Sequence, residues 1–263
     1  MKKYILLMLL AFNLIFSCSD DNRSGNRSLE IPDQIPVYTP EIYNTFTHDA
    51  NAFTQGLFCS DGFIYESTGK YGESSLRKVE IESGTVIQKI DLDSKYFGEG
   101  ITLYGNKIIQ LTWLSKRGFV YDKDSFELIG EFGYPTEGWG ITYDGENLIM
   151  SDGTDILYFL DPENFSRVKQ VNVTANGKAV TRLNELEYID GKIYANVWQT
   201  YKIAVIQPDG EVISWIDLEG ILLPRDCPRE IDILNGIAYN DKDNKMYLTG
   251  KYWCKLFELK VAP

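Results

Sequence analysis

The chain has 263 residues, of which 44% are hydrophobic and 13% aromatic, and its formal net charge is −12. This length and composition suit one large β domain, and the absence of a basic stripe argues against nucleic acid as a partner. The single histidine, His48, excludes a zinc site or a catalytic triad built on several histidines. We expect His48 to make a hydrogen bond at the surface.

The first residues have the pattern of a targeting segment. Lys2 and Lys3 precede an apolar run over residues 4–16, which is too short to span a bilayer and predicts a signal peptide at residues 1–17. The run ends in Ser17-Cys18, which resembles a bacterial lipoprotein processing site in which Cys18 becomes the lipidated N-terminus. The alternative is ordinary secretion, with Cys18 incidental.

A polar, acidic stretch follows at residues 19–26, and we expect residues 18–40 to form a tether. The expected location is therefore the bacterial cell envelope. There the lipid on Cys18 would anchor the protein to a membrane, facing the periplasm or the cell surface.

From residue 53 onward, a turn of small residues opens an aromatic-rich strand pair five times. The openings follow at steps of 44, 40, 45 and 51 residues, counted at Gly56, Gly100, Gly140, Glu185 and Gly236. Repeats of this length built from short strands are typical of propeller blades. We therefore predict that residues 41–263 form an all-β, five-bladed β-propeller that carries the active site.

Each of the first four repeats contains four predicted strands, separated by turn signals such as Asp61-Gly62 and Asp190-Gly191. The fifth repeat contains three, at residues 236–240, 245–250 and 255–261. Residues 41–47, which precede the first repeat, are the candidate for its missing strand. Pairing the N-terminal strand with the last blade would close the ring and remove two exposed sheet edges.

Three cysteines lie within the predicted propeller: Cys59, Cys227 and Cys254. An exported protein reaches a compartment that permits disulfides. Cys227 with Cys254 is the most plausible pair, with Cys59 buried in its strand. Three cysteines without a spacing pattern leave this pairing open.

The candidate site residues occupy equivalent positions in the repeats, one step before the Gly-apolar pair. Because the first strand of each propeller blade lines the central channel, these side chains are expected to converge. They are Gln55, Glu99, Trp139, Asn184 and Asn235. A carboxylate, several amides and a tryptophan together indicate a functional site. The structural alternative is a plug of polar side chains linked by water along the axis.

Further aromatic residues and one cation are expected on the same face, because strand ends on one face of a propeller lie together. They are Phe53, Phe97, Trp113, Trp198 and Lys251. For each tryptophan alone, packing between blades is the alternative. Glu185 stands in the glycine position of its repeat and is expected to point along the channel and bond to its neighbours, whereas Glu187 is expected to face away.

Several of these strings carry a resemblance to a known family. Phe53-Thr54-Gln55-Gly56-Leu57, Phe97-Gly98-Glu99-Gly100-Ile101, Leu183-Asn184-Glu185-Leu186-Glu187 and Thr249-Gly250-Lys251 resemble the plant and bacterial type of glutaminyl-peptide cyclotransferase. The likeness runs from about residue 41 to 261. It implies a five-bladed propeller that converts the N-terminal Gln of peptides to pyroglutamate with release of ammonia, and it implies Glu99 as the catalytic carboxylate. The zinc-dependent animal type is unrelated in fold.

This reaction fits the predicted residues, because the substrate supplies both its nucleophile, the α-amine, and its electrophile, the γ-carboxamide. Glu99 would shuttle the proton, Asn184 and Gln55 would bind the carboxamide, and Lys251 would stabilise the oxyanion. The aromatic side chains would enclose the substrate. No cofactor is required, although a structural cation in the channel is possible. We expect a monomer whose partners are peptides or proteins with N-terminal Gln.

Two other functions remain open at this stage. The first is a non-catalytic propeller lipoprotein that binds a peptide or sugar in the same channel. The second is a calcium-dependent propeller hydrolase. That class needs several carboxylates converging on the channel, whereas here the inner positions are mostly amides plus Glu99.

Overall fold

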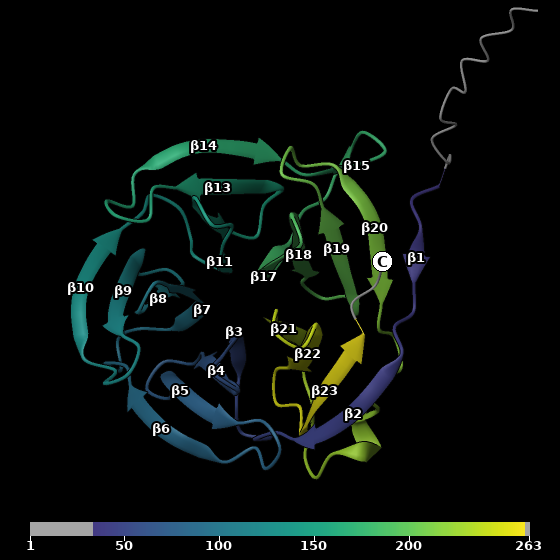
Figure 1. The fold of residues 1–263 in the computed structure, drawn as a ribbon, viewed down its shortest axis with the longest axis horizontal. Helices are drawn as coiled ribbons and strands as arrows, with labels where there is room; N and C mark the ends of the chain where they lie inside the picture. The colour runs from purple at the N-terminus through teal and green to yellow at the C-terminus, as the bar shows by residue number, and fades with distance from the viewer. Residues whose placement is uncertain (1–33, 261–263) are drawn as a thin grey trace, which may run out of the picture. The chain divides into compact units, whose positions relative to one another are not determined.

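The computed structural model describes residues 34–260. Five of the six sheets in these residues are arranged as blades around a central axis, with the first strand of each blade innermost and its fourth strand on the rim (Figure 1). The predicted all-β, five-bladed propeller is confirmed. In this part of the chain the helical structure is a single 3-10 turn, η1 (Pro224–Asp226).

The blades follow one another in chain order. Blade 1 contains β3 (Thr54–Ser60), β4 (Phe63–Thr68), β5 (Ser75–Glu80) and β6 (Val86–Asp91). Blade 2 contains β7 (Gly98–Tyr104), β8 (Lys107–Thr112), β9 (Arg117–Asp122) and β10 (Leu128–Gly133). Blade 3 contains β11 (Ile141–Tyr143), β12 (Leu148–Ser151), β13 (Ile156–Leu160) and β14 (Arg167–Asn172). A small hairpin, β15 (Thr174–Ala175) and β16 (Lys178–Ala179), leads to the next blade.

Blade 4 contains β17 (Leu183–Ile189), β18 (Lys192–Val197), β19 (Lys202–Ile206) and β20 (Val212–Asp217), and blade 5 contains β21 (Leu234–Asn240), β22 (Lys245–Gly250) and β23 (Lys255–Lys260). The inner hairpins turn where the sequence indicates. Asp61 and Gly62 have φ values of 52° and 79°, and Asp190 and Gly191 have 48° and 79°. Two successive positive φ values define the tight turn whose twist matches that of the flanking strands, and Asp-Gly accommodates it.

The N-terminal strand completes the last blade. Strand β2 (Ile42–Thr47) runs antiparallel to β23, with Ile42 opposite Leu259 and Thr47 opposite Lys255. In Figure 1 the purple β2 lies alongside the yellow β23 on the rim. The predicted closure of the ring is therefore confirmed.

The expected tether differs from the structure at its C-terminal end. Strand β1 (Val37–Tyr38) adds to blade 4, parallel to β20, and the Trp215 amide donates to the Pro36 carbonyl at 2.8 Å. Ile35 packs against the hydrophobic cluster between blades 3 and 4. The tether boundary at residue 40 is therefore too late. The Pro-rich composition gave no strand signal here. The backbone nevertheless forms hydrogen bonds with β20 on the rim. The remaining predicted leader and tether, with Cys18, lie outside the described residues.

Five separate hydrophobic clusters hold the blades together, one at each seam. Between blades 1 and 2, for example, Tyr65 and Leu76 pack with Ile101 and Ile108, and all four are fully or almost fully buried. The other clusters fill the remaining seams, including the one between blades 5 and 1. Because each seam has its own core, truncating a leucine or isoleucine in one of them is expected to cost about 2–5 kcal/mol.

Two side-chain arrangements tie blade 5 to the segments around it. Cys227 and Cys254 form a disulfide with Cα atoms 5.6 Å apart, the pair that the sequence favoured, while Cys59 remains free and half-buried. The expectation for His48 is wrong, because it is buried. Its Nδ1 lies 2.7 Å from the Trp253 carbonyl and its Nε2 lies 3.1 Å from Glu66 Oε1. Both neighbours are acceptors, so each ring nitrogen donates a hydrogen bond. No sequence pattern links His48 to Glu66.

The channel is tightly packed where the repeats place glycine. A Cβ atom on Gly56 would lie 2.5 Å from the Ile101 nitrogen, and one on Gly100 would lie 2.7 Å from the Gly140 Cα. Side chains cannot fit at such close approaches.

Among residues 34–260, no helix has the length and apolar character that crossing a membrane requires.

Candidate active site

A cavity of about 690 Å³ opens at one end of the channel. All nine predicted catalytic and substrate-binding residues line it: Phe53, Gln55, Phe97, Glu99, Trp113, Trp139, Asn184, Trp198 and Lys251. Four further lining residues were not singled out from the sequence: Lys70, Gln199, Asp232 and Ile233. The structure therefore brings together side chains from all five blades.

Irregular pairing of the innermost strands sets the direction of the polar side chains. Strand pairing slips between Thr54 and Gly56, between Gly98 and Ile101, between Leu183 and Leu186, and between Leu234 and Ile237. Each slip contains one candidate residue: Gln55, Glu99, Asn184 or Asn235. An extra residue in one strand re-aims a side chain and commonly occurs beside active sites. In blade 3 strand β11 begins only at Ile141, so Trp139 stands in the segment before it.

Glu99 lies at the centre of this arrangement and is 4% exposed. Its Oε1 accepts a 2.8 Å hydrogen bond from Gln55 Nε2. Burial raises the pKa of Glu99 well above its ordinary value, while the charge of Lys251 and the Gln55 hydrogen bond partly offset that rise. A carboxyl group in such surroundings can hold a proton near neutral pH and exchange it with a basic partner.

The amide side chains continue from Glu99 into the channel. Asn235 Nδ2 donates to Gln55 Oε1 at 3.3 Å and to the Thr54 carbonyl at 3.1 Å. Asn235 therefore supports Gln55 from behind and does not itself line the cavity. Asn184 does line it, and its buried Oδ1 has no hydrogen-bond partner within the described residues. A buried acceptor without a partner is costly, so it suits a donor on a bound ligand.

Two lysines face the cavity beside one aromatic ring. Lys251 is 4% exposed, and its Nζ lies 4.8 Å from the centroid of the Phe53 ring, while Lys70 Nζ lies 4.0 Å from it. Burial lowers the pKa of Lys251, and the charge of Glu99 partly opposes this. The site thus holds a buried acid and a buried base that influence each other.

Five of the thirteen residues that line the cavity are aromatic. Edge-to-face contacts join Tyr252 to Phe53 at 5.2 Å, Phe53 to Phe97 at 6.0 Å and Phe97 to Trp113 at 5.6 Å between centroids. On the other side, Trp139 meets Trp198 at 5.5 Å. These rings exclude water from a ligand and present their faces to a cation.

Glu185 closes the channel beneath the cavity. Its Oε1 accepts from the Leu57 amide at 3.1 Å, and its Oε2 accepts from the Ile237 amide at 2.8 Å. One side chain of blade 4 therefore bonds to the inner strands of blades 1 and 5. This is the role expected from its position in the glycine place of the repeat.

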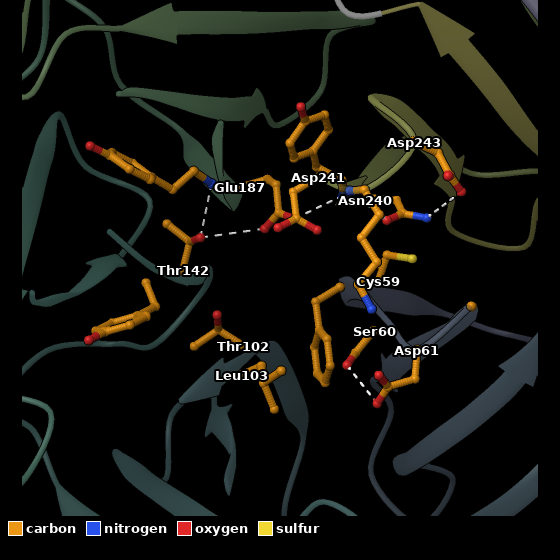
Figure 2. Close-up of a pocket in the computed structure, with 16 residues that line it drawn as sticks. Cys59, Ser60, Asp61, Thr102, Leu103, Thr142, Glu187, Asn240, Asp241 and Asp243 are labelled. Carbon is orange, nitrogen blue, oxygen red and sulfur yellow. Dashed lines mark hydrogen bonds between the residues drawn. The ribbon is translucent and has the colours of Figure 1, made fainter. Parts of the chain in front are cut away.

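A second cavity, of about 450 Å³, lies around Glu187 and is separate from the first in its lining residues. Figure 2 shows Glu187 with Thr142 and a group of acidic side chains, Asp61, Asp241 and Asp243, around this space. Glu187 thus faces away from Glu99, as expected. Within residues 34–260, no group of three or more His, Cys, Asp or Glu side chains is arranged to hold a metal ion. The possible channel cation stays a prediction.

Of two further side chains that sequence reasoning missed, Lys70 had a usable signal and Glu137 had none. Lys70 lies in Tyr65-Glu66-Ser67-Thr68-Gly69-Lys70-Tyr71-Gly72, a further string that resembles the same family. In the structure its φ is 90°, which is unusual for a residue other than glycine. Its carbonyl accepts from Ser74 Oγ at 2.7 Å, which helps to fix the loop. Glu137 directly precedes Gly138 and Trp139, but nothing in its position indicates that it contacts two indoles.

The fold and the cavity together define a five-bladed propeller whose site combines one buried carboxylate with amides, a buried lysine and an aromatic wall. Residues 9–261 match the sequence profile of the family described as glutamine cyclotransferase, and the chain belongs to that family.

Two relatives are similar over most of the chain. The glutaminyl-peptide cyclotransferase of Arabidopsis thaliana is 41% identical over 244 residues, which cover 91% of this chain and 76% of the relative. The crystal structure of Myxococcus xanthus glutaminyl cyclase superimposes with a TM-score of 0.81 at 32% identity, covering 86% of this chain and 98% of that one.

Proposed function

We propose that this protein converts the N-terminal glutamine of peptides to pyroglutamate, and that Glu99 carries the proton. Family membership and the two relatives support the glutaminyl-peptide cyclotransferase activity. The observation that carries the role of Glu99 is its place in the cavity. It is a buried carboxylate with one amide donor, beside the charge of Lys251.

The reaction rearranges bonds within the substrate. The α-amine nitrogen attacks the γ-carbonyl carbon, a C–N bond forms, and the bond to the carboxamide nitrogen breaks. Glu99 accepts a proton from the attacking amine and delivers it to the departing nitrogen, which leaves as ammonia. Substrate and products balance without an oxidant, a reductant or an added water molecule, and no covalent enzyme intermediate is required.

The electrostatics of Glu99 suit both proton transfers. A free α-amine has a pKa of about 7.7–8.0, so most of it is protonated at neutral pH. The raised pKa of Glu99 brings the carboxyl group closer to the amine in proton affinity. Transfer between groups of similar pKa is inexpensive in either direction, and a shuttle requires both directions.

The other polar side chains are assigned by where they face the cavity. Asn184 Oδ1, which has no partner in the described structure, is suited to accept from the substrate carboxamide. Gln55 holds Glu99 and adds an amide for the same group. Lys251, which also lines the cavity, would stabilise the negative charge that develops on the γ-oxygen. Such a donor typically contributes about 10²–10³-fold to the rate.

The aromatic wall holds the substrate in its folded-back conformer. Phe53, Phe97, Trp113, Trp139 and Trp198 surround the space in which the five-membered ring would form. Their faces favour the incoming ammonium by ~0.5–2 kcal/mol per contact. Correct positioning alone can lower a barrier by several kcal/mol, so enclosure is expected to be the larger contribution.

Mass spectrometry of a Gln-initiated peptide incubated with the purified protein tests this function. We expect loss of one ammonia from the free peptide and none from its N-acetylated form, which lacks the nucleophile. A chelator arm separates the alternatives: turnover that persists supports cyclisation, whereas calcium-dependent cleavage of an ester or sugar supports a hydrolase. Equal conversion of the acetylated and free peptides would contradict the mechanism, and no turnover would leave a binding protein.

We also propose that Cys18 carries a lipid that anchors the protein at the bacterial cell envelope. The apolar run before Ser17-Cys18 and the polar stretch after it support this proposal. Metabolic labelling with a fatty acid should mark the wild-type protein and not Cys18→Ser, which should also leave the membrane fraction. Labelling of both proteins would contradict the assignment.

A further inference from the structure

Glu137 makes an unusual pair of hydrogen bonds at the cavity wall. Its Oε2 accepts from Trp113 Nε1 at 2.6 Å and from Trp139 Nε1 at 2.9 Å. Trp113 follows β8 in blade 2, whereas Trp139 precedes β11 in blade 3. One carboxylate oxygen therefore joins two indoles that belong to neighbouring blades.

The segment that carries Glu137 is itself fixed. Tyr134, three residues earlier, donates through its hydroxyl to the Thr112 carbonyl at 2.5 Å and accepts from the Thr112 amide at 2.9 Å. Gly138 packs so closely on Tyr134 that a Cβ atom there would meet the phenol ring. The Trp139 amide also donates to the Ser151 carbonyl at 3.0 Å. Glu137 thus extends from an anchored loop to both rings.

The position of Glu137 coincides with the gap in the aromatic wall. Ring contacts run from Tyr252 through Phe53 and Phe97 to Trp113, and a separate contact joins Trp139 to Trp198. Among the described residues no ring contact connects the two groups. The Glu137 carboxylate bridges them, so that six rings act as one wall.

We propose that Glu137 is a positioning residue, which holds Trp113 and Trp139 in the orientation that grips the substrate and so sets its affinity. This inference rests on the proposed function of the cavity. Glu137 is not among the residues that line the cavity, so it acts through the two indoles. Hydrogen bonds to a carboxylate are stronger than those to neutral acceptors, and they hold each ring in one rotamer. An anionic acceptor on the indole N–H also increases the electron density of the ring, which favours a bound ammonium.

The same carboxylate also affects the catalytic acid. The negative charge of Glu137 contributes to the raised pKa of Glu99, although burial is the main cause and Lys251 opposes it. Two substitutions separate the effects. Glu137→Gln keeps a carbonyl oxygen for both indoles and removes the charge, whereas Glu137→Ala removes both.

The test compares these variants with Glu131→Gln, a control in β10 whose carboxylate pairs with the exposed Arg117. We expect Glu137→Ala to raise KM about tenfold, with a smaller change in kcat, because a lost charge-assisted hydrogen bond in a binding wall weakens ground-state binding. We expect Glu137→Gln to restore KM to within about threefold. Its acidic limb in the pH profile of kcat/KM should lie at lower pH, because the charge that helps to raise the Glu99 pKa is gone.

A measurement that needs no turnover separates this proposal from the function itself. Acrylamide should quench tryptophan fluorescence more strongly in Glu137→Ala than in the wild type, Glu137→Gln or the control, and thermal melts establish that each variant is folded. Wild-type KM and wild-type quenching in Glu137→Ala would overturn the proposal. So would a Glu137→Gln variant as defective in KM as Glu137→Ala. A wild-type protein without turnover would overturn the proposed function, whereas the quenching result would still test the positioning.

Discussion

The two cavities each contain a buried carboxylate, but the carboxylates are bonded differently. Glu187 uses both oxygens within the protein: Oε1 accepts from the Tyr239 amide at 2.9 Å and Oε2 from Thr142 Oγ1 at 3.4 Å. Glu99 is bonded by Gln55 alone among the described residues and faces an aromatic wall. Burial raises the pKa of both groups. A raised pKa alone therefore does not distinguish the two carboxylates, whereas their hydrogen bonds do: Glu99 keeps one oxygen without a donor among the described residues.

The difference between Glu99 and Glu187 is tested most strongly by neutralising each carboxylate in turn. Glu99→Gln should reduce turnover by about 10²–10⁴-fold with little change in Tm, because it preserves shape and removes the proton shuttle. Glu187→Gln is the matched control and should keep turnover within a few-fold of the wild type. Steady-state kinetics with a Gln-initiated peptide measures both. Near-normal activity of Glu99→Gln, or an equal loss in Glu187→Gln, would contradict the assignment.

Lys251 distinguishes the first cavity by its buried cation. Lys251→Met should lower kcat about 10²-fold through loss of oxyanion stabilisation. It should also move the acidic limb of the kcat/KM profile to higher pH. The reason is that the Lys251 charge lowers the pKa of Glu99, and its removal lets that pKa rise further. A limb that moves to lower pH, or stays in place, would show that the two groups are not coupled.

Glu185 belongs to neither cavity and should affect stability more than the cavity carboxylates do. Glu185→Ala leaves the amides of Leu57 and Ile237 without acceptors in the channel. Each buried donor left without a partner costs about 1–3 kcal/mol. Urea denaturation should therefore show a free energy of unfolding lower by at least that amount. An unchanged midpoint would mean that water replaces the carboxylate without cost.

The smallest expected effect concerns the pH dependence of stability at Glu187. Burial raises its folded-state pKa from 4.5 to about 8. Folding therefore favours the protonated form, so the contribution of this group is fully present below pH 4.5 and is lost as the pH rises toward 8. Glu187→Gln mimics the protonated form. Its Tm should decline less than that of the wild type between pH 5 and 8, and parallel declines would contradict the shift.

The periodic features of the molecule could be predicted from the sequence, and so could the residues at equivalent places in the repeats. Glu99, Gln55 and Asn184 follow from one repeating position, and the closing strand follows from the missing strand of the fifth repeat. Contacts made outside the repeat could not be predicted. His48 contacts Glu66 across the closing seam, and β1 pairs with the edge of β20. Glu137 accepts hydrogen bonds from two indoles of different blades. In each case tertiary packing brings the partners together, and they do not occupy equivalent positions of the sequence repeat.

The pairing of β2 with β23 fixes the order in which this protein can mature. Ile42 lies opposite Leu259, so the second of the described strands to be synthesised has its partner in the last of them. Blades 1 to 4 can form hairpins as they emerge, since their contacts are local. The seam between blades 5 and 1 must wait for β23, and a contact of such long range carries a large loop-closure entropy. Until then the unpaired β2 is exposed to other chains, and the completed ring is the state that protects it.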